Sequence, residues 1–265
     1  MIKNYFKIAV RGMIQSKLFT AINLIGLAIS MSVGLLIITF ITDLVSYDDF
    51  HENKDNIYRI ITSDQKENEP VINLASSSLN AARSIKENFT GIEDITTLRT
   101  GFGGIAKIDA KELPFQAYWA DNSFLNVFTY TLLEGNPVSA LKEPYSLVLT
   151  EKSAKKMFGK SDVLGKIISI EDVNYTVTGI LKDIPKLSYL NFEALVSYST
   201  AEQQFLKTDG DFMSWASIYQ DYTYVLLPSN LNTESFQTNL DLLAKNENKK
   251  LVDRKITLSL QPLTN

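Results

Sequence analysis

The chain has 265 residues, no cysteine, and 26 Lys and Arg against 30 Asp and Glu, which gives a formal net charge of −4. Without cysteine there are no disulfides, no thiol chemistry and no cysteine-ligated metal. An acidic balance of this kind disfavours phosphate backbones, so we expect no nucleic-acid partner.

The first 17 residues predict a short amphipathic helix lying on a membrane. Lys3, Lys7 and Arg11 recur at i, i+4 and i+8, and the apolar side chains gather on the other side. With Lys17 they form a basic segment that contains no acidic residue. We predict a cytoplasmic anchor whose charged line faces anionic headgroups, or else a cytoplasmic partner.

Residues 18–42 predict a transmembrane helix. The run holds no ionisable side chain, and at about 1.5 Å per residue its length of about 37 Å exceeds a hydrocarbon core of about 30 Å. A cleaved signal peptide has a shorter apolar run and a small-x-small site, whereas this run ends in Phe40-Ile41-Thr42-Asp43. We therefore predict that the helix is retained.

The flanks of this helix predict its orientation. All four basic residues of the first 42 precede the apolar run, and acidic residues, among them Asp43, Asp48 and Asp49, follow it. Short segments rich in Lys and Arg stay in the cytoplasm. We expect the N-terminus to be cytoplasmic and residues 43–265 to lie outside.

One line of the predicted helix consists of small residues. Gly26, Ser30 and Gly34 recur at i, i+4 and i+8, and such stripes let helices approach closely in lipid. The alternative is that glycine and serine are simply common in membrane helices. If the stripe packs, its partner belongs to another chain, so we expect a homo- or heterodimer.

The remaining residues exceed the size of a typical domain, which predicts one large domain or two subdomains. Apolar periodicity and turn residues predict a mixed α+β fold, with a polar loop at 64–70, a hairpin turn at the glycines of 101–104, and Asp121, Thr150 and Thr233 as helix N-caps. We expect helices at 78–89, 122–128, 151–158 and 234–246, and strands from Ile57 and at 95–99, 105–108, 115–120, 146–149, 167–170, 175–180, 193–197, 222–227 and 256–260.

Three sequence patterns resemble nucleotide-binding or metal-binding motifs. The glycines of 101–104 lack the GxGxxG spacing, and residues 154–161 match a relaxed P-loop whose helix precedes the glycine instead of following it. His51, the one histidine, stands beside carboxylates in a polar turn typical of ordinary surface. GxSxG and HExxH are both missing, which disfavours a membrane-tethered hydrolase, and we predict no catalytic, cofactor-binding or metal-ligating residue.

Several sequence blocks then carry a family resemblance. In order along the chain, the sequence resembles the N-terminal part of MacB/FtsX-type ABC transporter permeases, which is a first transmembrane helix followed by a MacB-like periplasmic core domain. After the basic N-terminus and first span, the blocks are YDDFHENKDNIYRI (47–60), FLNVF (124–128), LLEGNP (132–137), LVLTEKSAKKMFG (147–159), VLGK (163–166), YTVTGILKDIP (175–185), NF (191–192) and LQPL (260–263).

The resemblance implies a non-catalytic permease component of export or mechanotransmission type in the bacterial inner membrane. Its periplasmic domain would engage a substrate or partner, and would divide into a porter-like subdomain (about 49–113 and 222–262) and an inserted subdomain (about 114–221). ATP would be bound by a separate ABC ATPase subunit, so no cofactor is expected in this chain.

The later membrane helices and coupling loop of the family do not occur in these residues, and we expect a truncated or split permease. The alternative is a bitopic membrane-anchored sensor or ligand-binding ectodomain. Against it, the 17 residues before the span are too few for a cytoplasmic output module.

Overall fold

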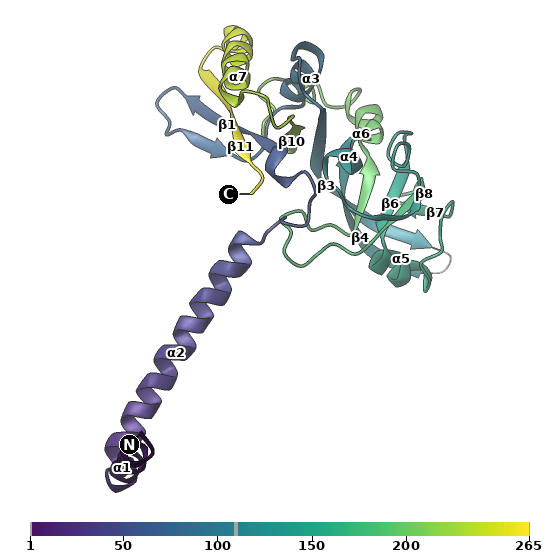
Figure 1. The fold of residues 1–265 in the computed structure, drawn as a ribbon. Coiled ribbons are helices and arrows are strands. Elements are labelled where there is room, and N and C mark those ends of the chain that lie inside the picture. Colours follow the sequence, from purple (N-terminus) through teal and green to yellow (C-terminus); the bar gives the residue numbers. More distant parts are fainter. Residues whose placement is uncertain (1, 109–110, 265) are drawn as a thin grey trace. The chain divides into compact units, whose positions relative to one another are not determined.

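The computed structural model describes residues 2–108 and 111–264 and divides the chain into two compact units (Figure 1). The first unit is helical and ends at Tyr47, and the second begins at Asp48 and contains every described strand. The predicted architecture, an N-terminal apolar helix followed by a mixed α+β domain, is confirmed.

Two helices make up the first unit. Helix α1 spans Ile2–Gln15 and helix α2 spans Lys17–Val45, and neither buries any residue. Between them the backbone of Ser16 leaves the helical region, with φ −106° and ψ 56°. Helix α2 is long and apolar enough to cross a membrane, with a mean hydropathy of 2.5. Both predicted helices are present, and α2 extends beyond residues 18–42 at either end.

The domain is built on a sheet of eleven strands. They are β1 (Ile57–Lys66), β2 (Ile72–Leu74), β3 (Asp94–Ile108), β4 (Lys111–Ala120), β5 (Leu132–Gly135), β6 (Ser146–Thr150), β7 (Ile167–Ile170), β8 (Val173–Leu181), β9 (Ala194–Ser197), β10 (Asp221–Leu226) and β11 (Arg254–Pro262). Their order is β11-β1-β10-β3-β4-β9-β6-β8-β5, with β2 beside β1. The β4–β9 and β6–β8 pairs are parallel and the other pairs are antiparallel.

One half of the sheet closes on itself. Strand β7 pairs with β8 on one side and with β3 on the other, so β3, β4, β9, β6, β8 and β7 form a ring. The largest core cluster consists of the side chains that these strands turn toward one another, such as Phe102, Phe115, Leu147, Ile168 and Val177. We call this ring the barrel.

Five α-helices and two 3₁₀ turns complete the described part of the domain. The helices are α3 (Leu79–Asn88), α4 (Phe124–Val127), α5 (Glu151–Phe158), α6 (Tyr198–Phe205) and α7 (Thr233–Glu247), and the turns are Lys54–Asn56 and Asn248–Lys250. Helix α7 packs on β11, α3 on β3 and β10, and α5 on β6 and β8 of the barrel (Figure 1). Further core clusters lie under α3 and α7 and around the aromatic rings of α4.

Local capping chemistry sets several of these boundaries. Thr150 Oγ1 accepts from the Ser153 N–H at 3.2 Å, and Gly159 ends α5 in the left-handed conformation at φ +75°, as the sequence predicts. Helix α7 is capped by Asn232, whose side chain accepts from two backbone N–H groups, so the prediction of Thr233 as its cap is wrong by one residue. Asp121 accepts from the Ser123 N–H, but α4 begins only at Phe124.

Two sequence predictions about loops are wrong. The glycines of 101–104 are not a hairpin turn, because β3 continues through them and a bulge between Arg99 and Phe102 absorbs the irregularity. Packing favours glycine at position 104, because a Cβ there would lie 2.6 Å from the Glu171 side chain. The polar segment 64–70 begins later than expected, because β1 runs to Lys66 and Asp64 pairs with Arg254 across the sheet.

Helix α6, in a stretch that sequence periodicity left unassigned, was missed. The division into porter-like and inserted subdomains stays a prediction, since the sheet passes through both segments.

Candidate functional site

The predicted packing stripe lies on α2. Gly26 and Ser30 are exposed and Gly34 is half-buried, and a Cβ built at either glycine meets no atom within 4 Å. Within the described part of the chain nothing covers this line, so it is sterically open to a second helix. That a helix packs there stays a prediction.

The predicted cytoplasmic anchor is equally open. Lys3, Lys7 and Arg11 lie on α1 and Lys17 begins α2, and all four are exposed. Among the described residues none forms an ion pair with them. Their charges are therefore free for a membrane surface or a partner.

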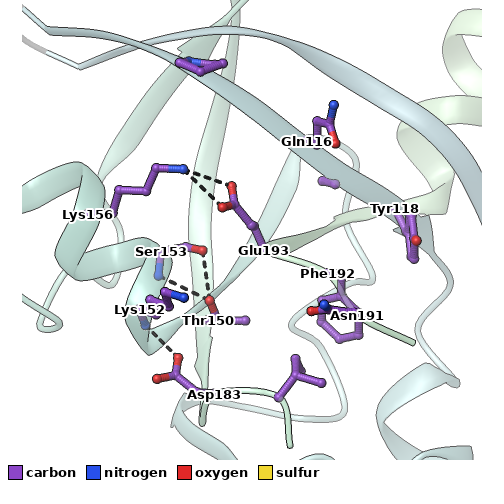
Figure 2. A pocket seen from close by; sticks show the side chains of 13 residues that line it. Gln116, Tyr118, Thr150, Lys152, Ser153, Lys156, Asp183, Asn191, Phe192 and Glu193 are labelled. Atoms are coloured by element: carbon purple, nitrogen blue, oxygen red, sulfur yellow. Dashed lines mark hydrogen bonds and ion pairs between the residues drawn. The ribbon is translucent and has the colours of Figure 1, made fainter. Parts of the chain in front are cut away.

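In the domain, a cavity of about 550 Å³ opens beside the barrel, between β4 and α5. We call it the slot. Its lining is mainly polar, and Figure 2 shows the side chains pointing into it from both walls. The lining includes Gln116 and Tyr118 on β4, Lys152 and Lys156 on α5, and Asp183 and Glu193 on the connecting segments.

Charges in the slot are partly neutralised. Lys156 Nζ lies 3.1 Å from Glu193 Oε1, and Asp183 Oδ1 accepts from the Lys152 backbone N–H at 2.8 Å, at the positive end of α5 (Figure 2). The Lys152 ammonium has no ion-pair partner among the described residues. The Lys152 ammonium is therefore free to bind an anionic ligand, whereas a ligand would have to compete with Glu193 for Lys156.

A second cluster lies where the domain begins. Asp48 is 1% exposed, and its Oδ1 accepts from Ser188 Oγ at 2.7 Å while its Oδ2 has no hydrogen-bond partner among the described residues. Burial raises the pKa of this carboxyl. The Ser188 hydroxyl also meets Tyr130 Oη at 3.2 Å, which joins the carboxyl to an aromatic cluster.

The histidine of this cluster contradicts the sequence interpretation of His51 as ordinary surface. His51 is 2% exposed, with the rings of Phe50, Tyr130 and Phe128 at centroid distances of 4.0, 4.9 and 5.2 Å. Neither ring nitrogen has a hydrogen-bond partner among the described residues. Burial lowers the pKa of His51 to about 4, so the ring is neutral at neutral pH.

Two features of the sequence relate to metal and phosphate sites, the acidic and histidine side chains and the segment that resembles a P-loop. No group of three His, Cys, Asp or Glu side chains suited to a metal occurs among the residues that the structure describes. The segment that imitates a P-loop is the end of α5, where Gly159 acts as the C-cap, and it does not open a helix onto a phosphate.

The comparisons with known proteins agree with this architecture. The family model of the MacB-like periplasmic core domain matches residues 20–243. The chain belongs to this family. It is therefore related to the periplasmic regions of MacB-like ABC transporter permeases. No curated protein sequence matches the chain.

Three solved structures show the fold of this family. A domain of a "putative Permease protein" from Porphyromonas gingivalis is 23% identical, with a TM-score of 0.64, covering 80% of this chain and 91% of that one. The periplasmic region of MacB from Actinobacillus actinomycetemcomitans is 18% identical (TM-score 0.51, 77% and 89%). The extracellular domain of the noncanonic ABC-type transporter YknZ from Gram-positive bacteria is 15% identical (0.52, 77% and 100%).

Family membership and helix α2 together indicate a bacterial membrane protein with a MacB-like periplasmic domain. Sequence reasoning found the family but neither the slot nor the buried cluster. Both are assembled from segments far apart in the chain, and neither leaves a local motif.

Proposed function

We propose that the chain is a non-catalytic permease component of an ABC transporter of export or mechanotransmission type, whose periplasmic domain engages a substrate or partner protein. ATP is bound by a separate ABC ATPase subunit. The observation that supports this most is the firm attachment of the residues that follow the apolar helix. A sensor or ligand-binding ectodomain is the alternative.

The attachment involves three distant parts of the domain. The Asp48 N–H donates to the Leu187 carbonyl at 3.0 Å, the Glu52 N–H donates to Thr129 Oγ1 at 2.9 Å, and the Leu263 N–H donates to the Ile57 carbonyl at 2.9 Å. A displacement that reaches Asp48 along the chain therefore acts on segments near residues 129, 187 and 263 at once. This is what a permease needs if events in the membrane are to move its outer domain.

We propose a division of labour within the domain. The porter-like part, about 49–113 and 222–262, follows the membrane segment along the chain, and the inserted part, about 114–221, supplies Thr129 and Leu187 to the attachment and holds the slot. In this arrangement the inserted part contacts the substrate or partner, and the shared sheet transmits its displacement.

The orientation is tested by labelling single cysteines, for which the cysteine-free chain is a clean background. Spheroplasts carrying Lys207→Cys, an exposed domain position, should react with a membrane-impermeant maleimide. Those carrying Lys7→Cys should react only after lysis. The reverse pattern would place the domain in the cytoplasm and contradict the proposal.

Dimerisation is tested on the stripe of α2. Gly34→Ile places a branched side chain on the open line and should weaken crosslinking between permease chains in membranes. Ala28→Ile is the matched control, because residue 28 lies about 200° around the helix from Gly26. Equal crosslinking of Gly34→Ile and the parent would show that the stripe does not pack.

The transporter assignment is tested by isolating the protein from its own membranes after mild crosslinking. An ABC ATPase subunit should copurify, and its ATPase rate should change in the presence of the chain. A complex without an ATPase would refute the transporter assignment and favour the sensor.

A further inference from the structure

The slot marks a gap in the wall of the barrel. Strand β9 has only four residues, and it pairs with β4 only at Tyr118, Trp119 and Ala120. Strand β4 extends further toward its start and pairs there with β3 alone. Beyond the start of β9, the place of a neighbouring strand is occupied by the slot.

The gap exposes a strand edge. In an antiparallel ladder every second residue turns its N–H and C=O away from the partner strand. From Lys111 to Ala117 no described strand pairs with β4 on the side away from β3. Pro114, which has no N–H, limits pairing toward the start of the strand, so the usable edge is the portion from Phe115 onward.

The opposite wall fixes the width and charge of the gap. The Thr150 N–H donates to the Glu193 carbonyl at 3.1 Å, and the chain then turns into α5, so the helix replaces the strand that would otherwise continue the wall. Lys152 and Lys156 face β4 from α5, and Glu193 reaches across to Lys156 (Figure 2).

We propose that the slot takes an extended peptide segment of a partner protein, which adds to the free edge of β4 and places a carboxylate beside Lys152 and Lys156. The open edge selects an extended main chain, and the free Lys152 ammonium selects the negative charge. The proposal rests on the proposed function, because it names the kind of partner that the periplasmic domain engages.

Main-chain pairing is tested with a fluorescein-labelled peptide, Val-Thr-Val-Thr-Glu with a free C-terminus, and the full chain in detergent. Two twin peptides carry N-methyl groups, one on the odd residues and one on the even residues. Because only alternate N–H groups face a neighbouring strand, one twin should bind at least about tenfold more weakly and the other about as well as the parent. Deuterium exchange at residues 115–117 should slow when the parent peptide is bound.

Charge selection is tested with three variants. Lys152→Glu should weaken binding by about fivefold, as for an exposed ion pair, and Lys160→Glu is the matched charge reversal outside the slot. Glu193→Gln releases Lys156 and should tighten binding by a few fold. Amidating both carboxylates of the peptide should abolish the differences among these variants.

Three results would overturn the proposal. They are the absence of saturable binding up to about 1 mM peptide, equal binding of both methylated twins, and unchanged exchange at residues 115–117. None of them affects the labelling, crosslinking and ATPase experiments, so the slot can fail while the proposed function stands. If the ATPase is absent but the peptide binds, the slot belongs to a peptide-binding ectodomain.

Discussion

Two of the buried clusters of ionisable side chains in the domain are satisfied to different degrees. In the bulge region Asp221 accepts from Arg99 Nη1 at 2.6 Å and from the Tyr198 hydroxyl at 2.6 Å, and the guanidinium lies 4.9 Å from the Phe212 ring. Where the domain begins, Asp48 and His51 are equally buried, yet Asp48 Oδ2 and both His51 nitrogens have no partner among the described residues.

This difference distinguishes a cluster that stabilises the fold from one that responds to pH. A paired and hydrogen-bonded charge is costly to break and holds one geometry, as Arg99 and Asp221 do where β3 meets β10. An unpartnered neutral imidazole can be charged only by disrupting its surroundings. The cluster at Asp48 and His51 is therefore sensitive to acid, and it stands at the start of the domain along the chain.

The largest effect is expected from Asp221→Ala. The substitution leaves the Arg99 guanidinium buried without a counter-ion and should lower the free energy of unfolding by about 3–5 kcal/mol. Urea unfolding followed by tryptophan fluorescence reports on the domain alone, because Trp119 and Trp215 both lie in it. Glu202→Ala, which breaks a half-buried pair with Arg83, should cost about 1 kcal/mol. Equal losses would show that the buried Arg99–Asp221 pair is no costlier to break than the Arg83–Glu202 pair.

The next effect concerns His51. Its folded pKa is about 4 against an ordinary 6.5, so between these values the unfolded chain binds a proton that the folded domain does not. The contribution of His51 to stability should therefore fall by about 3 kcal/mol as the pH drops from about 6.5 to about 4.

His51→Phe is the variant that isolates this loss. Phenylalanine fills the aromatic site without a titrating group, so the difference between the unfolding free energies of the two proteins should change with pH in that window. Burial raises the pKa of Asp121 and of Asp221 to about 6, but both carboxyls remain in the variant and cancel in the difference. A difference that is constant from pH 7 to pH 4 would show that His51 is not buried as a neutral ring.

The sequence predicted best what depends on neighbours in the chain. Thr150 and Gly159 delimit α5, and the β7–β8 hairpin turns at Glu171 and Asp172, which adopt positive φ angles of 48° and 63°. These features follow from capping and turn chemistry within a few residues.

What the sequence did not predict depends on distant contacts. His51 is a polar residue among charged neighbours in the sequence, but two of the three rings that surround it, Phe128 and Tyr130, come from a distant part of the chain. The slot exists only because β9 ends before β4 does, and no residue type signals this. The glycines of 101–104 were assigned to a turn, whereas β3 continues through them and the missing side chain of Gly104 leaves room for Glu171 of the β7–β8 hairpin.

The smallest of these effects tests how much the Tyr198 hydroxyl contributes to the Arg99–Asp221 cluster. Tyr198→Phe removes one of two donors to Asp221 but leaves Arg99 in place, so it should cost about 2 kcal/mol, less than the loss of the carboxylate itself. The missing donor should also raise the pKa of Asp221 further, because the hydroxyl stabilises the charged form. The cost should therefore shrink below about pH 6, where the carboxyl becomes protonated and the lost donor matters less. A cost that stays the same from pH 8 to pH 5 would show that Tyr198 contributes by packing on Phe212 rather than through its hydroxyl.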